Sequence, residues 1–223
     1  MGAASGRKGT KMPENVNVPA RSSTLRVSAA PVWQGLLDKD QQTDLLNAVL
    51  QGAETAPLYR PDTPSGRPMS VEMTSAGEVG WITDRQGYRY EPRHPTGAPW
   101  PAIPQLALAV WRAVSGVKRD PSSCLINRYL DGAKMGLHQD RDEGDLSWPV
   151  VSISLGDDAL FRVGGTERKG QTQSIWLSSG DVVVLTGDTR LAYHGIDRVR
   201  TGSSTLVPGG GRINLTMRVV GNA

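Results

Sequence analysis

The sequence predicts a mostly β fold of the sandwich or jelly-roll type with flanking helices. Three observations favour it. The chain of 223 residues holds 26 glycines and 15 prolines, which is typical of a turn-rich fold. Short β-like runs recur from Ser123 onward, and glycine-containing turns separate them. Their spacing favours a sandwich or jelly roll over alternating β-α units, and the length suits one domain.

The first 22 residues predict a disordered basic leader. Large apolar side chains are scarce there, and Arg7, Lys8, Lys11 and Arg21 supply positive charge. We expect a solvated tail before a single domain at residues 23–223.

Two amphipathic helices are expected. The segment from Asp40 to Leu50 has its apolar residues at helical spacing, and Gly52 follows as a stop. Pro104 can begin a second helix, whose apolar face is formed by Leu106, Ala109, Val110, Ala113, Val114 and Val117. This second helix is expected to support a sheet.

Residues 57–100 show little periodicity and predict a long loop or a small hairpin that acts as a lid. The segment is rich in proline and glycine but includes Trp81, Tyr88, Tyr90 and Trp100. Long irregular segments in compact domains are often functional, so we expect substrate recognition here. His94 has no second ligand nearby and is expected in a surface loop.

The jelly-roll core is expected within residues 123–220. Its β-like runs are Cys124–Leu130, Val150–Leu155, Leu160–Val163, Gln173–Leu177, Val182–Leu185 and Arg212–Val220.

Composition and charge bear on the partner and the cellular compartment of the protein. The formal charge of +3 and the pI near 9.2 favour a polyanionic partner without requiring one. Cys124 is the only cysteine, so no intramolecular disulfide can form, and we expect it buried on a strand. No apolar run approaches the roughly 20 residues that span a bilayer, and we expect a cytoplasmic protein.

The strongest chemical signal is a possible metal site. His138 and Asp140 are two residues apart, so on an extended segment both side chains point to one face. His194, far downstream, can complete a 2-His-1-carboxylate triad for iron(II), which leaves positions open for a cosubstrate and oxygen. Zinc is the weaker assignment because a closed structural zinc site usually uses cysteines. By itself, His-x-Asp is a weak signal that occurs often by chance.

A second pattern strengthens this interpretation. In the segment from Arg212 to Arg218, alternate residues place Arg212, Asn214, Thr216 and Arg218 on one face. Two inward arginines suit a dicarboxylate such as 2-oxoglutarate, and Asn127 and Tyr129 can add donors. The alternative is that both arginines pair with the protein's own acids on a solvated face.

Five groups of residues carry a resemblance to a known family. They are Asn127-Arg128-Tyr129-Leu130 with Gly132-Ala133-Lys134, Leu137 to Glu143, Tyr193-His194-Gly195, Arg212-x-Asn214-Leu215-Thr216-x-Arg218, and Gly80-Trp81 with Arg85-Gln86-Gly87-Tyr88 and Pro99 to Ala102. From roughly Met69 to Val219 the chain resembles the AlkB family of nucleic-acid dealkylating dioxygenases.

The resemblance implies a double-stranded β-helix (a cupin-like jelly roll) with a nucleotide-recognition lid, which uses iron(II), 2-oxoglutarate and O₂. His138, Asp140 and His194 would ligate iron. The implied 2-oxoglutarate contacts are Asn127, Tyr129, Arg212, Asn214 and Arg218, the last near the metal-bound end as a catalytic residue. The implied substrate contacts are Trp81, Tyr88, Asp142 and Arg168.

The implied reaction repairs N-alkylated bases such as 1-methyladenine and 3-methylcytosine. 2-Oxoglutarate becomes succinate and CO₂, and the alkyl group leaves as an aldehyde. We expect a monomer acting on single-stranded DNA or on RNA. Two alternatives stay open: a 2-oxoglutarate-dependent hydroxylase of a protein or small molecule, and a cupin-like binding module without activity. Ile213 and Met217 depart from the family's aromatics and are expected to face away from the site.

Overall fold

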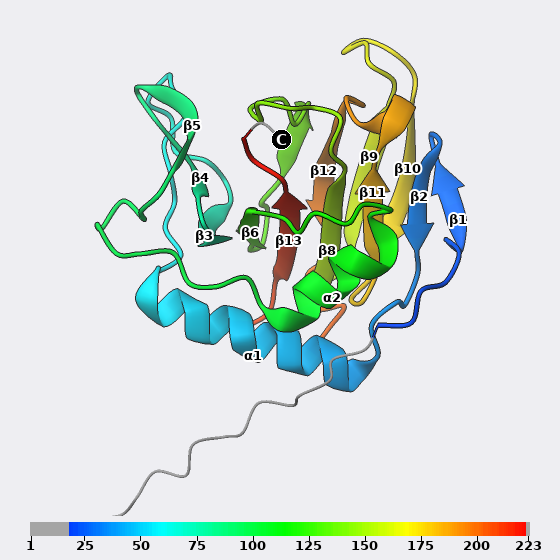
Figure 1. The fold of residues 1–223 in the computed structure, drawn as a ribbon, viewed down its shortest axis with the longest axis horizontal. Coiled ribbons are helices and arrows are strands. Elements are labelled where there is room, and N and C mark those ends of the chain that lie inside the picture. The colour runs from blue at the N-terminus through cyan, green and yellow to red at the C-terminus, as the bar shows by residue number, and fades with distance from the viewer. Residues whose placement is uncertain (1–17, 222–223) are drawn as a thin grey trace, which may run out of the picture.

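The structure is a computed structural model in which residues 18–221 are described, and two β-sheets form its body (Figure 1). The major sheet has seven strands in the spatial order β1 (Leu25–Val27), β2 (Ala30–Trp33), β11 (Val182–Leu185), β8 (Val150–Gly156), β13 (Arg212–Arg218), β6 (Ser123–Tyr129) and β3 (Glu72–Gly77). The minor sheet has the order β10 (Thr172–Leu177), β9 (Ala159–Gly164), β12 (His194–Val199) and β7 (Met135–His138). All strand pairings are antiparallel. The predicted jelly-roll class is confirmed.

Two helices cover the outer face of the major sheet (Figure 1). Helix α1 (Lys39–Thr55) begins with a capping box formed by Asp38 and Gln41. It runs through Gly52, which was expected to stop it. A Cβ at Gly52 would lie only 3.2 Å from Cγ of Pro101, so glycine permits close packing inside this helix. None of the helices within residues 18–221 is long and apolar enough to cross a membrane.

Helix α2 (Gln105–Val114) supports the sheet as expected. Pro104 is its N-cap, and Val117 lies beyond its end but still packs against the core. The buried residues Val110 and Trp111 belong to the same apolar cluster as Ile213 and Met217 of β13. Ile213 and Met217 therefore face the helices and not the space between the sheets, as predicted.

A second apolar cluster lies between the two sheets. Phe161, Val163 and Ile196 of the minor sheet share it with Leu125 and Val183 of the major sheet. Because side chains alternate along a strand, β13 contributes side chains both to the helix-side core and to the space between the sheets. Its apolar side chains pack toward the helices, and its polar ones enter the space between the sheets.

The segment at residues 57–100 was expected to be a long loop or a small hairpin, and it contains a hairpin together with an unexpected strand of the major sheet. Its middle part forms β3, an edge strand of the major sheet that pairs with β6. The hairpin of β4 (Gly80–Asp84) and β5 (Gly87–Glu91) stands apart from the two sheets at the upper left of Figure 1. We call residues 80–91 the lid hairpin.

The sequence boundaries of the leader and of the core also need correction. Residues 1–17 lie outside the described part of the chain. Val18 is buried in the helix-side core, and Arg21 donates hydrogen bonds to the carbonyl oxygens of Gln34 (3.2 Å) and Gly35 (2.8 Å). The folded part thus includes residues 18–22. The two sheets also take in β1, β2 and β3, which precede the predicted core at 123–220.

His94 is not a surface residue. Its side chain lies between Tyr59 and Trp100, with edge-on ring contacts to both, and only 3 % of the residue is exposed. Nε2 lies 3.0 Å from the carbonyl oxygen of Pro57, and Nδ1 accepts a hydrogen bond from the backbone N–H of Thr96 at 3.2 Å. A buried histidine of this kind helps to hold the base of the lid segment.

Candidate metal centre and substrate cavity

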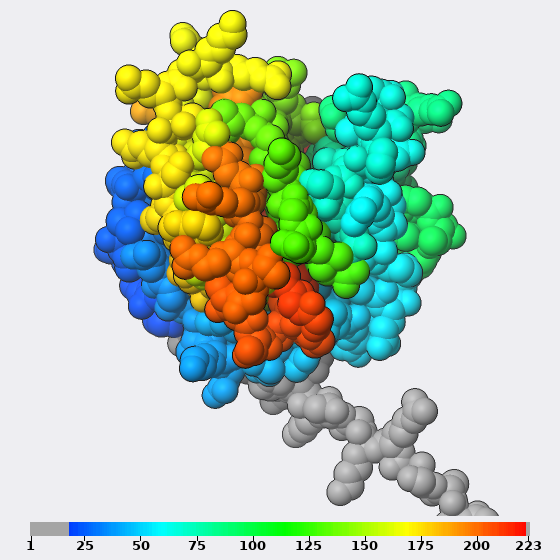
Figure 2. Space-filling view, turned by 180° about the vertical axis from the view of Figure 1, so that it is seen from behind, coloured from blue at the N-terminus to red at the C-terminus, as the bar shows by residue number. Residues whose placement is uncertain are grey.

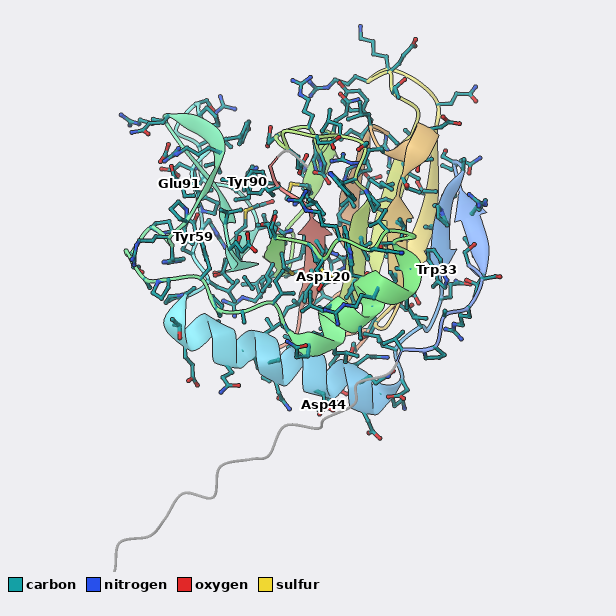
Figure 3. The ribbon with its side chains drawn as sticks, in the orientation of Figure 1. Trp33, Asp44, Tyr59, Tyr90, Glu91 and Asp120 are labelled. Atoms are coloured by element: carbon teal, nitrogen blue, oxygen red, sulfur yellow. The ribbon has the colours of Figure 1, made fainter. Side chains whose placement is uncertain are left out.

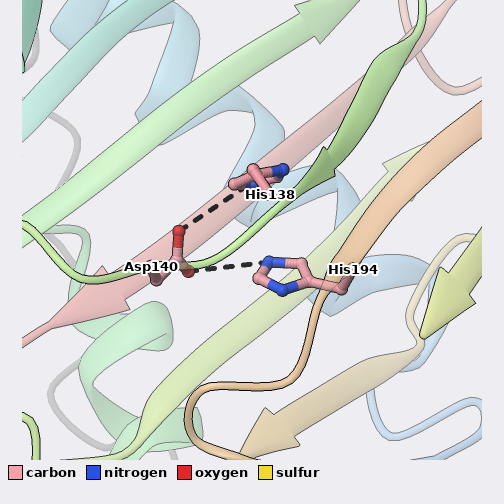
Figure 4. A group of neighbouring side chains, drawn as sticks. All are labelled: His138, Asp140 and His194. Carbon is pink, nitrogen blue, oxygen red and sulfur yellow. Dashed lines mark ion pairs between the residues drawn. The ribbon is translucent and has the colours of Figure 1, made fainter. Parts of the chain in front are cut away.

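The three predicted metal ligands meet between two adjacent strands of the minor sheet. His138 ends β7 and is the register partner of His194, which begins β12. Asp140 follows two residues later, and the potential ligand atoms of all three lie within 4.8 Å of one another. Nε2 of His138 is 3.7 Å from Oδ1 of Asp140, and Nε2 of His194 is 3.7 Å from Oδ2 (Figure 4).

Backbone carbonyls fix the orientation of both imidazoles. Nδ1 of His138 lies 2.9 Å from the carbonyl oxygen of Gly136, and Nδ1 of His194 lies 2.9 Å from that of Ala192. When Nδ1–H donates to these oxygens, the lone pair of each Nε2 points at the centre. Two imidazoles and one carboxylate on one side of a centre are the donor set that non-haem iron(II) oxygenases use. The residues present therefore fit iron(II).

The charges at the centre favour metal binding. Burial alone would raise the pKa of Asp140, but Arg218, with Nη2 at 2.8 Å from Oδ2, and the two histidines hold that pKa below its usual range. Burial lowers the pKa of His194 to about 4. At neutral pH the carboxylate is thus ionised and His194 is neutral, which are the states that bind a cation.

A cavity of about 440 Å³ opens beside this centre, between the two sheets and the lid hairpin. Every site residue predicted from the sequence lines it: Trp81, Tyr88, Asn127, Tyr129, His138, Asp140, Asp142, Arg168, His194, Arg212, Asn214 and Arg218. Seen from behind, the orange segment that contains β12 lies beside the green segment that contains β7 (Figure 2). The structure therefore brings the predicted residues together, while their individual roles stay predictions.

Deep in this cavity lies Arg212, with donors that the protein does not use. Arg212 is 1 % exposed, and its Nε and Nη1 have no hydrogen-bond partner among residues 18–221. Nη2 donates to Oγ of Ser154 at 3.1 Å, and the guanidinium lies over the Tyr129 ring. Buried, unused guanidinium donors fit a carboxylate, so the residues fit 2-oxoglutarate.

Other parts of the predicted cosubstrate set are arranged differently. Oδ1 of Asn127 is also buried without a partner in the described chain, and it is an acceptor. The side chain of Asn214 is already bonded within the protein, to Ser152, Ile153 and Thr216. Arg212 and Arg218 are both buried, so the alternative of a solvated face is wrong, although Arg218 does pair with the protein's own acids Asp140 and Glu143.

The lid hairpin places an aromatic pair at the mouth of the cavity. The indole Nε1 of Trp81 donates to Oδ2 of Asp142 at 2.9 Å. The Trp81 ring stacks on Tyr88, with ring centroids 5.4 Å apart and an interplanar angle of 17°. Tyr88 is 52 % exposed, and Arg168 reaches the cavity from the loop between β9 and β10.

Sequence reasoning missed a buried ionic group behind the metal site. Glu143 was not among the predicted site residues, but it is buried and lies within 3.0 Å of Arg190 and Arg218. Tyr90 donates to it at 2.8 Å. The position of Glu143 three residues after Asp140 was a usable signal. Arg190 had none, because an arginine beside a turn predicts exposure.

Comparisons with known proteins agree with this geometry. Residues 30–218 match the 2OG-Fe(II) oxygenase superfamily. The chain is 57% identical over 188 residues to the alpha-ketoglutarate-dependent dioxygenase AlkB homolog of Caulobacter vibrioides (strain NA1000 / CB15N), covering 84% of this chain and 86% of that protein. It is 44% identical over 182 residues to alpha-ketoglutarate-dependent dioxygenase AlkB of Escherichia coli (strain K12), covering 79% and 84% respectively. The solved structure of OsALKBH1 aligns with a TM-score of 0.71 and 28% identity, covering 89% of this chain and 100% of that one.

Proposed function

Because this chain belongs to the 2OG-Fe(II) oxygenase superfamily and, within it, to the AlkB family, we propose that it repairs N-alkylated nucleic-acid bases by oxidative dealkylation. The observation that carries the proposal is a single cavity lined by the metal triad, by Arg212 and by the lid residues Trp81 and Tyr88. 1-Methyladenine and 3-methylcytosine in DNA or RNA are the expected substrates.

The position of each side chain supports the role proposed for it. His138, Asp140 and His194 hold Fe(II), and Arg212 binds the far carboxylate of 2-oxoglutarate, with Asn127, Tyr129 and Asn214 beside it. Arg218 holds Asp140 in its ionised form. Together with O₂, the bound Fe(II) and 2-oxoglutarate supply the oxidation that hydroxylates the alkyl carbon, with release of succinate and CO₂. The hydroxylated adduct then sheds an aldehyde and restores the base.

Base recognition takes place at the lid. The flipped base stacks on Trp81, which contributes roughly 1 to 3 kcal/mol against the few kcal/mol that unstacking costs. Asp142 accepts a hydrogen bond from the exocyclic amine, and its charge suits a cationic methylated base. Tyr88 contacts the phosphate backbone of the nucleic acid, and Arg168 lines the substrate pocket. Stacking on Trp81 roughly offsets the cost of unstacking the base. This supports single-stranded nucleic acid as the preferred substrate, since no base pair has to be broken there.

The remaining features of the proposal concern the whole chain. We propose one dioxygenase domain, expected at residues 23–223 and extended here to begin at residue 18, in which residues 57–100 recognise the nucleotide, and a cytoplasmic monomer. The support for one domain is the shared cavity, which takes residues from both sheets and from the lid hairpin.

The test is formaldehyde release from an oligonucleotide that contains 1-methyladenine, with Fe(II), 2-oxoglutarate and air, and with each component omitted in turn. Release that depends on all of them supports the proposal. No release, despite turnover of 2-oxoglutarate on a protein or small molecule, indicates the alternative hydroxylase.

Two variants separate the metal site from the substrate site. Asp140→Ala should abolish turnover, whereas Asp145→Ala, a matched change outside the cavity lining, should not. Asp142→Ala should impair base repair but leave uncoupled consumption of 2-oxoglutarate. Equal loss of both reactions in Asp142→Ala contradicts its role in base recognition.

A further inference from the structure

Behind the metal site lies an ion-pair cluster made of Asp140, Glu143, Arg190 and Arg218. Glu143 lies 3.0 Å from Nη2 of Arg190 through Oε2 and 3.0 Å from Nε of Arg218 through Oε1. Arg218 in turn contacts Asp140. The side chains are 1 to 8 % exposed, and two positive charges balance two negative ones. Buried charges are tolerated when they are paired in this way.

Arg190 also fixes the backbone of the loop that carries Asp140. Its Nη1 donates to the carbonyl oxygen of Asp140 and its Nε to that of Trp148, both at 2.6 Å. One guanidinium therefore holds both ends of the segment at residues 140–148. Arg190 itself follows the short helix η1 (Gly187–Thr189) and lies four residues before His194. The cluster thus links the two chain segments that carry Asp140 and His194.

The same cluster reaches the lid hairpin. Trp81 and Tyr90 are register partners in that hairpin, and Figure 3 places Tyr90 on its side facing the sheets. Trp81 donates to Asp142 at 2.9 Å, and the hydroxyl of Tyr90 donates to Oε1 of Glu143 at 2.8 Å. Two neighbouring lid side chains are therefore bonded to two consecutive acids, the second and third residues after the metal ligand Asp140.

The two bonds differ in what can compete with them. Asp142 is exposed, and in the proposed function it accepts a hydrogen bond from the exocyclic amine of the base in place of the one from Trp81. Glu143 also borders the cavity, but its side chain is only 1 % exposed, and both of its carboxylate oxygens are already engaged by Tyr90, Arg190 and Arg218. Burial raises the pKa of Tyr90, so its hydroxyl remains a donor at every working pH. The Tyr90 bond can therefore persist while the Trp81 bond is exchanged for substrate.

We propose that Glu143 is a positioning residue that ties the lid hairpin to the metal-binding loop through Tyr90 and is itself held in place by Arg190. Glu143 also shares Arg218 with Asp140, so its negative charge offsets a positive charge next to the metal. Its removal affects the lid and the metal together, whereas removal of the Tyr90 hydroxyl affects the lid alone.

The test compares Tyr90→Phe and Glu143→Gln with Glu54→Gln, the same chemical change at an exposed position of α1. Hydrogen exchange of the amides at residues 80–91 reports on the lid, and Mn(II) affinity, measured by electron paramagnetic resonance without turnover, reports on the metal site. The KM for the oligonucleotide is a third readout, and it alone depends on the proposed function.

Tyr90→Phe should accelerate exchange in the lid hairpin and raise KM about 5-fold, the factor for one lost hydrogen bond, with unchanged Mn(II) affinity. Glu143→Gln should change the lid in the same way and also weaken Mn(II) binding about 10- to 100-fold, as loss of a partner behind a ligand does. Glu54→Gln should change none of the three.

Unchanged lid exchange in Tyr90→Phe overturns the proposal even if Glu143→Gln fails to fold, because this variant removes a single oxygen atom. Unchanged Mn(II) affinity in a folded Glu143→Gln overturns the link to the metal. If exchange and Mn(II) affinity change as expected but no oligonucleotide is turned over, the positioning role stands and the proposed substrate falls.

Discussion

At the scale of single residues, Arg212 stands out because its burial is costly without a ligand. Burial lowers the pKa of its guanidinium, and two of its nitrogen atoms have no partner among residues 18–221. Such a side chain destabilises the ligand-free protein and is retained for what it binds. A buried charge of this kind makes stability depend on the ligand.

Arg212→Met is therefore expected to leave the ligand-free protein as stable as before, or more stable, because a well-packed apolar side chain replaces a desolvated charge. In the unsubstituted protein, Mn(II) with 2-oxoglutarate at about 100 times its Kd should raise the stability by about 2.7 kcal/mol. The variant should lose most of this gain. Thermal unfolding with and without the ligand measures both effects, and a full ligand-induced shift in the variant contradicts the assignment.

His94 is a second buried residue whose charge state matters for stability. Burial lowers its pKa, so the folded protein resists a proton that the unfolded chain takes up near pH 6.5. A proton on Nδ1 also removes the acceptor for the N–H of Thr96. The stabilising effect is complete above about pH 6.5 and is lost as the pH falls below it.

We expect the melting temperature to fall between pH 7 and pH 5, and to fall less steeply in His94→Gln, which cannot be protonated. The difference between the two profiles isolates His94 from the other titrating groups. Parallel profiles over this range mean that the His94 pKa is not lowered in the folded protein.

At the scale of elements, the sequence predicted strands best where the apolar pattern was strong. The runs at β6, β8, β9, β10, β11 and β13 were found, and the alternation in β13 correctly separated Ile213 from Asn214. Strands with a weak pattern were missed. β3 holds small and polar residues such as Ser75 and Gly77, β7 is short, and both β7 and β12 include glycine. Their pairing comes from tertiary contacts that no local pattern records.

The contact between β7 and β12 depends on a glycine beside the metal site. Gly195 lies where the register of the two strands shifts, between His194 and Ile196. A Cβ there would lie 2.5 Å from the backbone oxygen of Met135 and 2.9 Å from that of Gly136. Gly136, on the facing strand, has nothing within 4 Å of the corresponding position.

Gly195→Ala should therefore push the two strands apart and separate His138 from His194. We expect about 10-fold or greater loss of Mn(II) affinity and a decrease of about 1 to 3 kcal/mol in the free energy of unfolding. Gly136→Ala is the matched control and should be close to neutral. Equal effects of the two substitutions contradict the proposed close approach.

At the scale of the whole molecule, the ion-pair cluster could not be predicted as a unit, because the only local signal was the position of Glu143 three residues after Asp140. His138 and Asp140 could be assigned to one site because they are close in sequence. Arg218 could be assigned to it because of the alternation along its strand. Glu143 and Arg190 are 47 residues apart, and isolated charges in loops usually predict solvent exposure. Only the packed fold shows that these charges are enclosed and paired.

The net charge of +3 and the cavity-lining Arg141 and Arg168 predict salt-sensitive binding. If about three phosphates are contacted, raising the salt from about 50 to about 200 mM should weaken binding of a single-stranded oligonucleotide roughly 20-fold. A single methylated nucleoside, which has no phosphate, should show almost no dependence. A titration at several salt concentrations provides the slope, and a flat oligonucleotide profile contradicts phosphate recognition.

The solitary thiol of Cys124 has a practical consequence. It is fully buried, and burial raises its pKa to about 12, so it is not a nucleophile towards maleimides or thiosulfonates under ordinary conditions. Site-directed labelling through an introduced cysteine therefore needs no prior replacement of Cys124. A nitroxide attached at Gln86→Cys, on the exposed tip of the lid hairpin, could be paired with Mn(II) at the centre as a second spin. The separation of the two spins would then follow the lid as substrate enters and leaves.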